Sequence, residues 1–231
     1  MKPYVMCHML CSVDGRILNH RWRPKGQVAG GLFERLHDQL GGGSWLCGRV
    51  TAQEFAKVKG LDAHYPPSDQ TFPREPYFVQ RRAEAWGVFL DARGKAVWGR
   101  SDIGGDPILV ILTEAVSDAH LAGLRADNIS YIFAGVAEID LAAALETLNH
   151  ELGVERLMLE GGGSANGALL RAGLVDELSL VICPVIDGGS GAPSVFDSGK
   201  TDLSPAPIER MALTGHEVLD GGVVWLRYRL S

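Results

Sequence analysis

Apolar residues along the chain occur in two patterns, short unbroken runs and spacings of three or four positions. Short runs are typical of buried strands, whereas the wider spacing is typical of the buried face of a helix. The runs predict strands over residues 4–13, 44–47, 77–79, 88–91, 108–112, 129–133, 154–159 and 178–186. The spacings predict helices over residues 32–40, 49–55, 117–124, 140–152 and 164–172. This alternation indicates parallel strands with helices on both faces of the sheet.

The carboxyl-terminal part of the chain follows a different pattern. No helix is expected after Pro184, and two apolar runs at 210–218 and 223–230 flank the turn-forming Asp220-Gly221-Gly222. The arrangement predicts a terminal antiparallel hairpin. Its last strand is expected to lie at a sheet edge, where it would be covered or paired with another chain.

Two segments read as loops rather than as domain boundaries. Residues 60–76 are rich in Pro, Asp and Ser, and strands are expected to resume after them. Residues 19–26 are basic and contain a tryptophan, which fits either a solvated loop or a lid over an anionic ligand. The sequence therefore predicts one α/β domain over residues 1–231.

Several helix ends carry recognisable signals. Ser117, Asp140 and Ser164 each stand where a side chain can cap the first turn of a predicted helix. Gly173 follows the last of these helices, where a glycine commonly adopts the left-handed conformation.

Three consecutive glycines, Gly161-Gly162-Gly163, follow Glu160 at the end of a predicted strand and precede a predicted helix. Such a turn exposes backbone N–H groups, and the helix dipole adds about half a positive charge, so the unit can bind a phosphate. The alternative is a tight turn without a ligand. The stretch is not a Rossmann fingerprint, because Asn166 stands where the last glycine belongs, and the chain contains no Walker loop.

The composition narrows the functional classes. With 46% apolar and 22% charged residues, the 231-residue chain is typical of a soluble globular protein. A net charge of −6 argues against a nucleic-acid partner, and no apolar stretch is long enough to span a membrane. The cysteines lack the spacing of a zinc site, so we expect no metal and a cytoplasmic protein with reduced core thiols. They are Cys7, Cys11, Cys47 and Cys183.

Six motifs occur in the order found in a known family. They are Ser12-Val13-Asp14-Gly15-Arg16, Gly48-Arg49-Val50-Thr51, Leu90-Asp91-Ala92-Arg93-Gly94, Glu160-Gly161-Gly162-Gly163, Gly173-Leu174-Val175-Asp176-Glu177-Leu178 and Pro184-Val185-Ile186-Asp187-Gly188-Gly189. With these motifs essentially the whole chain resembles the reductase half of the bacterial riboflavin-biosynthesis deaminase-reductase. The zinc-binding motifs of the deaminase half do not occur in the sequence, so a stand-alone reductase domain is expected.

The resemblance implies a fold, a reaction and a set of contacts. The implied fold is dihydrofolate reductase-like: a mixed, mostly parallel sheet flanked by helices, binding NADPH at the carboxyl ends of its strands, in a homodimer. The implied reaction is hydride transfer to the ribosyl carbon of a pyrimidine ribosylamine phosphate, such as 5-amino-6-(5-phosphoribosylamino)uracil. The implied cofactor contacts are Gly48, Arg49, Thr51, Ala92, Gly161, Gly162, Gly163, Ser164, Ala165 and Asn166. The candidate substrate contacts are His8, Asp14 and Glu160, of which Glu160 is also the candidate catalytic residue.

Three of these residues also have structural interpretations. Arg49 matches the arginine that meets the 2′-phosphate in folate reductases, which favours NADPH over NADH; otherwise it is a surface cation at a helix start. Glu160 either orients the substrate or bonds to nearby backbone N–H groups, since a buried carboxylate without partners is costly. His8 replaces the lysine usual in the family and is either a site residue or a packed strand residue.

The substrate half departs from the family. The riboflavin enzymes follow the groove threonine with Ala-Asp-Asp-Pro and an arginine for the substrate phosphate, whereas Thr51 is followed here by Ala52-Gln53-Glu54-Phe55-Ala56-Lys57. Two other functions therefore stay open. One is a reductase of the same fold acting on a pterin, a carbonyl or an imine, and the other is a nucleotide-binding protein without catalysis. Candidates for a replacement phosphate contact are Lys57, Lys59, Arg21 and Arg23, and Glu34 and Asp38 are candidate acids for a pterin reductase.

Overall fold

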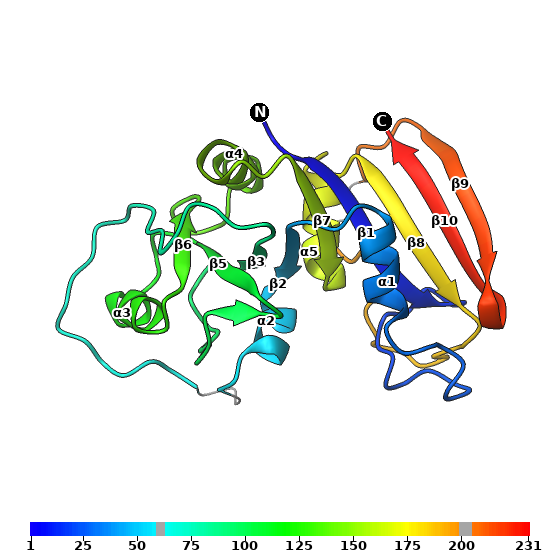
Figure 1. Ribbon diagram of the computed structural model, residues 1–231, viewed down its shortest axis with the longest axis horizontal. Coiled ribbons are helices and arrows are strands. Elements are labelled where there is room, and N and C mark those ends of the chain that lie inside the picture. Colours follow the sequence, from blue (N-terminus) through cyan, green and yellow to red (C-terminus); the bar gives the residue numbers. More distant parts are fainter. Residues whose placement is uncertain (59–62, 199–204) are drawn as a thin grey trace. The chain divides into compact units, whose positions relative to one another are not determined.

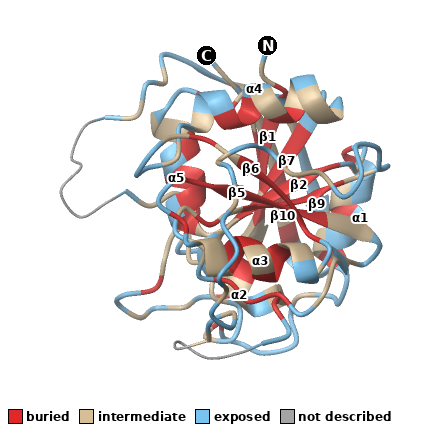
Figure 2. Ribbon diagram, turned by 90° about the vertical axis from the view of Figure 1, so that its left-hand side faces the viewer, coloured by how far each residue is buried: buried red, intermediate tan, exposed pale blue. Residues whose placement is uncertain are grey.

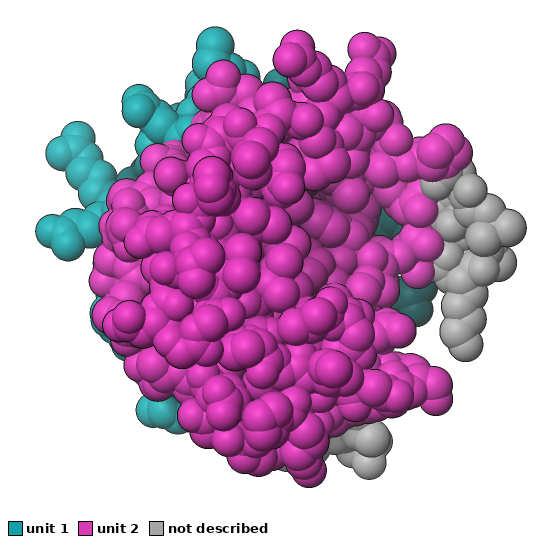
Figure 3. Space-filling model, turned by 90° about the vertical axis from the view of Figure 1, so that its right-hand side faces the viewer, with its two compact units in different colours: residues 1–3, 43–155 teal, residues 4–42, 156–231 magenta. Residues whose placement is uncertain are grey.

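The computed structural model describes residues 1–58, 63–198 and 205–231 (Figure 1). Lys59 and the first residues of the predicted loop at 60–76 lie outside this part. The chain divides into two compact units, which Figure 3 shows in different colours. Unit 1 comprises residues 1–3 and 43–155, and unit 2 comprises residues 4–42 and 156–231. The prediction of one domain stays a prediction.

The sheet of unit 1 is mostly parallel. Its parallel strands run in the order β2, β3, β5 and β6, and the short β4 pairs antiparallel with the start of β5. Their bounds are β2 (Trp45–Gly48), β3 (Gly87–Leu90), β4 (Asp102–Ile103), β5 (Asp106–Leu112) and β6 (Ser130–Phe133). The strand residues are largely buried, as Figure 2 shows, because apolar side chains point from both faces.

The described residues of unit 1 form three helices: α2 (Arg49–Phe55), α3 (Asp118–Ala126) and α4 (Leu141–Leu152). The predicted caps of the last two are confirmed, since Ser117 accepts from the N–H of His120 and Asp140 from that of Ala143. A strand at 77–79 was wrongly predicted: Tyr77 forms only a single bridge, with Tyr131.

The sheet of unit 2 combines parallel and antiparallel pairs. Strand β1 (Tyr4–Ser12) lies between the parallel strands β7 (Arg156–Gly161) and β8 (Glu177–Cys183). The predicted hairpin is confirmed as β9 (Met211–Leu219) and β10 (Val223–Leu230), joined by the short 3₁₀ turn η1 (Asp220–Gly222). Strand β10 pairs with β8, so β9 is the outer strand. The expectation that the last strand of the chain is the edge is therefore wrong.

In unit 2, the part of the chain that the structure describes forms two helices. Figure 1 shows α1 (Leu32–Gln39) in front of the sheet and α5 (Gly163–Arg171) behind it. The predicted cap at Ser164 is wrong, because the N-cap position is Gly162 and Ser164 is an exposed residue of the first turn. Gly173 is confirmed as the left-handed residue after α5, with a φ of 67°.

All four cysteines are buried and free, as expected for core thiols. In the part of the chain that the structure describes, every helix is too short or too polar to cross a membrane.

Candidate active site

The carboxyl end of β7 in unit 2 carries Glu160 opposite helix α1. Nδ1 of His37, in the last turn of α1, lies 2.6 Å from Oε1 of Glu160. Both side chains are mostly buried, with 9% of Glu160 and 16% of His37 exposed. The strand tip therefore holds a desolvated carboxylate whose partner is an imidazole rather than only backbone N–H groups.

His8 lies in β1 and is fully buried. Its Nδ1 is 3.0 Å from Oγ of Ser179, which also accepts from Nε1 of Trp225, and its Nε2 is 3.4 Å from the carbonyl oxygen of Phe33. Because a carbonyl can only accept, Nε2 carries the hydrogen and Nδ1 accepts from the serine hydroxyl. Burial lowers the pKa of His8 to about 4. These contacts favour the packing interpretation of His8 over the prediction of a substrate contact.

Asp14 follows β1 at an exposed turn. Its carboxylate accepts hydrogen bonds from Oγ of Ser12 at 2.6 Å and from the backbone N–H groups of Asp187 and Gly188. These donors, led by Ser12, hold the pKa of Asp14 well below its usual range. Asp14 thus ties the end of β1 to the loop after β8, and its predicted role in substrate binding stays a prediction.

The glycine turn between β7 and α5 has two separate causes. Gly162 has a φ of 70°, a conformation that favours glycine. A Cβ on Gly163 would lie 2.3 Å from the carbonyl oxygen of Ser194 and 2.8 Å from Oδ2 of Asp197. The segment at 194–197 therefore packs against the start of α5. Close packing within the chain accounts for Gly163, so three glycines alone do not require a ligand.

The same segment explains Asn166. Its side chain is fully buried and donates to the carbonyl oxygen of Val195 at 2.9 Å, while its backbone N–H is bonded to Gly162. Asn166 therefore anchors the chain to itself, which favours a packing role over the predicted cofactor contact. Helix α5 has no side-chain cap, so the N–H groups of its first turn remain the donors that a phosphate would use.

Unit 1 contains a basic pocket of about 580 Å³ at the carboxyl end of β3. Three cations line it and, among the described lining residues, no acid does. Its lining residues are Arg49, Gln53, Leu90, Ala92, Arg93, Lys95 and Ile139. Two predicted cofactor contacts, Arg49 and Ala92, thus meet at one pocket, and Arg93 and Lys95 join them. A pocket with this set of donors suits a phosphate.

Asp91 fixes the turn that carries two of these cations. Its Oδ2 accepts from the backbone N–H groups of Lys95 at 2.6 Å and Ala96 at 2.8 Å. Burial raises the pKa of Asp91, while those hydrogen bonds and the charges on Arg49 and Lys95 oppose the rise. The buried carboxylate thereby orders the turn beside the pocket.

The remaining predicted contacts of unit 1 lie around the start of α2. Gly48 is the N-cap, with an extended backbone that any residue adopts, and Thr51 is half-buried in the first turn. Phe55, which interrupts the family pattern, packs against Trp45 and Phe89 with ring centroids 5.6 and 6.0 Å apart. Its role is in the core, so it does not replace the missing substrate arginine.

The cations of the loop at 19–26 bond to their own chain. Nη2 of Arg21 lies 2.8 Å from Oδ1 of the buried Asp187, Nη1 of Arg23 donates to the carbonyl oxygen of Trp22, and Nζ of Lys25 donates to that of His20. A lid over an anionic ligand stays a prediction.

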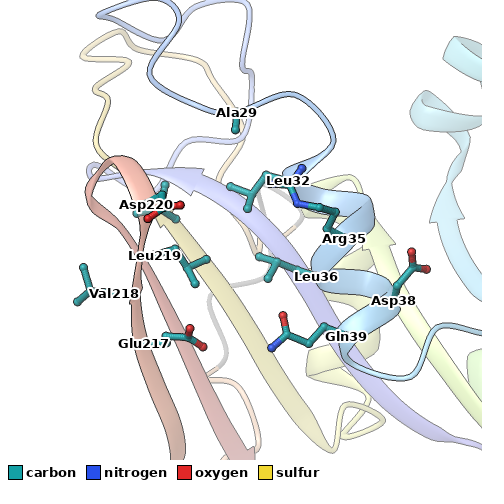
Figure 4. Close-up of a pocket in the computed structure, with 11 residues that line it drawn as sticks. Ala29, Leu32, Arg35, Leu36, Asp38, Gln39, Glu217, Val218, Leu219 and Asp220 are labelled. Atoms are coloured by element: carbon teal, nitrogen blue, oxygen red, sulfur yellow. The ribbon is translucent and has the colours of Figure 1, made fainter.

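A groove of about 650 Å³ in unit 2 lies apart from these candidates. Figure 4 shows its lining side chains, which come from α1, where Leu32 and Leu36 point towards the hairpin, and from the end of the hairpin at 217–220. Neither Glu160 nor the glycine turn lines it. Among the described residues there is no cluster of histidine, cysteine and acidic side chains able to hold a metal ion.

His37 is the residue of this site that sequence reasoning missed. It lies one helical turn after Phe33, whose ring stacks on that of His8 with centroids 4.6 Å apart. Spacing by four residues places two side chains on one face of a helix. The spacing from Phe33 could therefore have identified His37 from the sequence, because it places His37 on the side of α1 that faces the sheet.

Known proteins resemble this chain over much of its length. Residues 3–225 match the model of the RibD C-terminal domain. The 2,5-diamino-6-ribosylamino-4(3H)-pyrimidinone 5′-phosphate reductase of Methanothermobacter thermautotrophicus is 38% identical over 96 residues, which make up 42% of this chain and 44% of that protein. Its namesake from Archaeoglobus fulgidus is 40% identical over 81 residues, 35% of this chain and 36% of that protein. The matched stretches thus span less than half of either relative.

The crystal structure of a pyrimidine reductase-like protein from Corynebacterium diphtheriae has a similar fold. The TM-score is 0.70 and the identity 21%, over 99% of this chain and 92% of that one. At this identity the likeness supports the mixed α/β fold, whereas the family follows from the match over residues 3–225. The chain belongs to the RibD C-terminal domain family.

Proposed function

We propose that the chain is an NADPH-dependent reductase of a pyrimidine ribosylamine phosphate in riboflavin biosynthesis. The observation that carries the proposal is the family match over residues 3–225, which includes both Glu160 and Arg49. The names of the two relatives support this substrate class.

The residues of unit 1 fit the phosphate-bearing part of NADPH. The basic pocket combines Arg49, Arg93 and Lys95 with the apolar Leu90 and Ile139. Cationic donors suit a 2′-phosphate, and apolar walls suit the adjoining adenosine. We assign Arg49 to the 2′-phosphate, which favours NADPH over NADH. Gly48, Thr51 and Ala92 complete the proposed contacts of this unit.

Unit 2 provides different proposed contacts. The backbone of residues 161–165 at the start of α5 would bind the pyrophosphate, with the positive end of the helix dipole favouring its charge. Glu160 would bind the substrate as a hydrogen-bond acceptor, and Asp14 is a second proposed substrate contact. When bound, NADPH supplies the hydride, so the work of these residues is binding and orientation.

The cellular compartment and the oligomeric state of the enzyme are also proposed. Buried, free cysteines support a reducing compartment, hence a cytoplasmic protein. The exposed apolar side chains of the outer strand β9 support a homodimer.

The test is a direct assay of NADPH oxidation by the purified chain. NADPH oxidation would be followed with 5-amino-6-(5-phosphoribosylamino)uracil and with its 2,5-diamino-pyrimidinone counterpart, and the ribityl product identified by mass spectrometry. Turnover of either substrate supports the proposal. NADPH binding without turnover of these substrates, or of a pterin, carbonyl or imine panel, favours a nucleotide-binding protein, whereas turnover of a panel member alone assigns another substrate.

A further inference from the structure

Two features of α1 fix the backbone of His37. The N–H of Gly42 donates to the carbonyl oxygen of His37 at 3.0 Å, and the N–H of Gly41 donates to that of Asp38 at 2.9 Å. Gly41 and Gly42 have φ values of 103° and 57°, which L side chains rarely adopt. This pair of hydrogen bonds is the Schellman arrangement, so His37 occupies a defined position three residues before the C-cap, Leu40.

The surroundings of His37 favour a positive charge on its ring. The carboxylate of Glu160 lies 2.6 Å from Nδ1, and the carboxyl end of a helix stabilises cations. His8, the neighbouring histidine of β1, is held neutral, because burial and, to a smaller extent, the charge on His37 lower its pKa to about 4. The site therefore contains one core histidine and one histidine suited to an ion pair with Glu160.

An ion pair with both partners mostly buried fixes geometry more strongly than an exposed pair does. At 2.6 Å the distance is that of a charge-assisted hydrogen bond, which is short and directional. Because the imidazole is attached to a helix end with defined backbone bonds, it limits the rotamers open to the Glu160 carboxylate. A preoriented carboxylate binds its target without having to be ordered during the reaction.

We propose that His37 is a positioning residue for the reduction: its Nδ1–H fixes the Glu160 carboxylate in one orientation at the carboxyl end of β7. The inference rests on the proposed function and extends it, since it names the residue on which the action of Glu160 depends.

The experiment compares three variants with the wild-type protein. His37→Ala removes the donor, while His37→Asn keeps an amide N–H near the position of Nδ1. His150→Asn is the matched control, because His150 also pairs with a glutamate, Glu151, but its side chain is 85% exposed. For each protein, kcat/KM for the pyrimidine substrate, NADPH affinity and melting temperature would be measured.

We expect His37→Ala to lower kcat/KM roughly 10- to 100-fold, the scale of a misplaced catalytic contact. His37→Asn should recover most of that loss, and His150→Asn should retain wild-type kcat/KM. All three variants should bind NADPH like the wild type. A readout independent of turnover is the downfield proton resonance of a hydrogen-bonded imidazole N–H, which should be present in the wild type and absent from both His37→Ala and Glu160→Gln.

The outcomes separate the two proposals. Unchanged kcat/KM in His37→Ala, or equal losses in His37→Ala and His37→Asn that follow their melting temperatures, would overturn the positioning role alone. Absence of the imidazole resonance from the wild type would also overturn it. A wild-type protein that shows the resonance and binds NADPH, but turns over neither pyrimidine substrate, would overturn the proposed function and the positioning role together.

Discussion

Nη1 of Arg49 donates a hydrogen bond to Oε1 of Gln53, one turn further along α2, at 2.9 Å. The bond joins two of the residues that line the basic pocket of unit 1. Arg93 and Lys95 lie at the same pocket on the turn after β3, so three positive charges gather where Arg49 is held. The carboxylate of Asp91 offsets part of the charge on Arg49 and Lys95, and a bound phosphate would offset more of it. This setting supports a phosphate contact for Arg49 over a surface cation at a helix start.

Arg49→Ala should weaken NADPH binding by about 1.5–3 kcal/mol, the range for a hydrogen bond to a charged group. NADH lacks the 2′-phosphate, so its affinity should hardly change. Isothermal titration with both cofactors measures the difference. The control is Arg82→Ala, which removes an exposed arginine elsewhere in unit 1 and should bind both cofactors normally. Equal losses for NADPH and NADH would make Arg49 a structural residue.

Glu160→Gln should have the opposite signature. The amide keeps the size of the side chain but removes the charge that pairs with His37. We expect NADPH affinity to stay nearly intact and kcat/KM for the pyrimidine substrate to fall at least tenfold, which corresponds to about 1.4 kcal/mol of transition-state stabilisation. Steady-state kinetics and cofactor titration give the two values. Loss of NADPH binding in this variant would indicate that Glu160 contacts the cofactor rather than the substrate.

The local sequence was enough to predict most of the elements. Apolar runs and spacings are properties of neighbouring residues, so most of the strands, the helices and the caps at Ser117 and Asp140 agree with the structure, whereas the strand predicted at 77–79 does not. The cap predicted at Ser164 is wrong because α5 begins at Gly163, after Gly162 with its positive φ of 70°. One residue in an unusual conformation therefore changed which residue occupies the N-cap.

The features of the site that the local sequence does not predict arise from long-range pairing. Nothing near Glu160 in the sequence indicates His37, which lies 123 residues earlier and meets it only when α1 packs on the sheet. Likewise, the hydrogen bond from Asn166 to the carbonyl oxygen of Val195 joins residues 29 positions apart, and it favours a packing role over the predicted cofactor contact. The order of β9 and β10 is also a matter of pairing, since β10 joins β8 and leaves β9 outside.

Gly167→Ala should destabilise the protein, because a Cβ at this position would lie 1.7 Å from the carbonyl oxygen of Asp197. A clash with backbone can be relieved only by moving α5 or the segment at 194–197, at a cost of about 1–3 kcal/mol or more. Urea unfolding measures the loss. Gly30→Ala is the control, since nothing lies within 4 Å of its Cβ position and its φ is not in the left-handed region. Similar losses in both variants would argue against close packing at Gly167.

The free energy of unfolding should fall as the pH drops from about 6.5 to 4.5. Burial lowers the pKa values of His8 and His120 to about 4, from the usual 6.5, so in this range the unfolded chain binds more protons than the folded one. Above pH 6.5 each histidine is neutral in both states, and as the pH approaches 4 its protonation in the unfolded chain should lower the stability of the fold by about 3 kcal/mol.

Urea unfolding at several pH values tests this dependence. The pKa of a carboxyl such as Asp118 is lowered beside Arg74, so such groups change the free energy of unfolding mainly below their usual pKa of about 4. The change between pH 6.5 and 4.5 is therefore expected to come mainly from the histidines. His8→Leu should make the slope between pH 6.5 and 4.5 shallower, even if it also lowers stability at pH 7. An unchanged slope in His8→Leu would mean that His8 does not titrate as its burial requires.

The outer strand β9 should form the dimer contact. Met211, Leu213 and Val218 are 48%, 53% and 72% exposed, and an outer strand offers unpaired backbone groups beside them. The 24.9 kDa chain should therefore scatter light as a particle of twice that mass at micromolar concentration. Leu213→Lys should shift the particle to the monomer, because a charge at a strand edge opposes pairing. Since Leu213 is exposed, the substitution should lower the melting temperature less than a core substitution would. Val136→Lys changes an apolar residue of unit 1 that is 67% exposed, more than Leu213, and should leave the dimer intact. A wild-type particle of 24.9 kDa would contradict the dimer, and a dimer that survives Leu213→Lys would place the contact elsewhere.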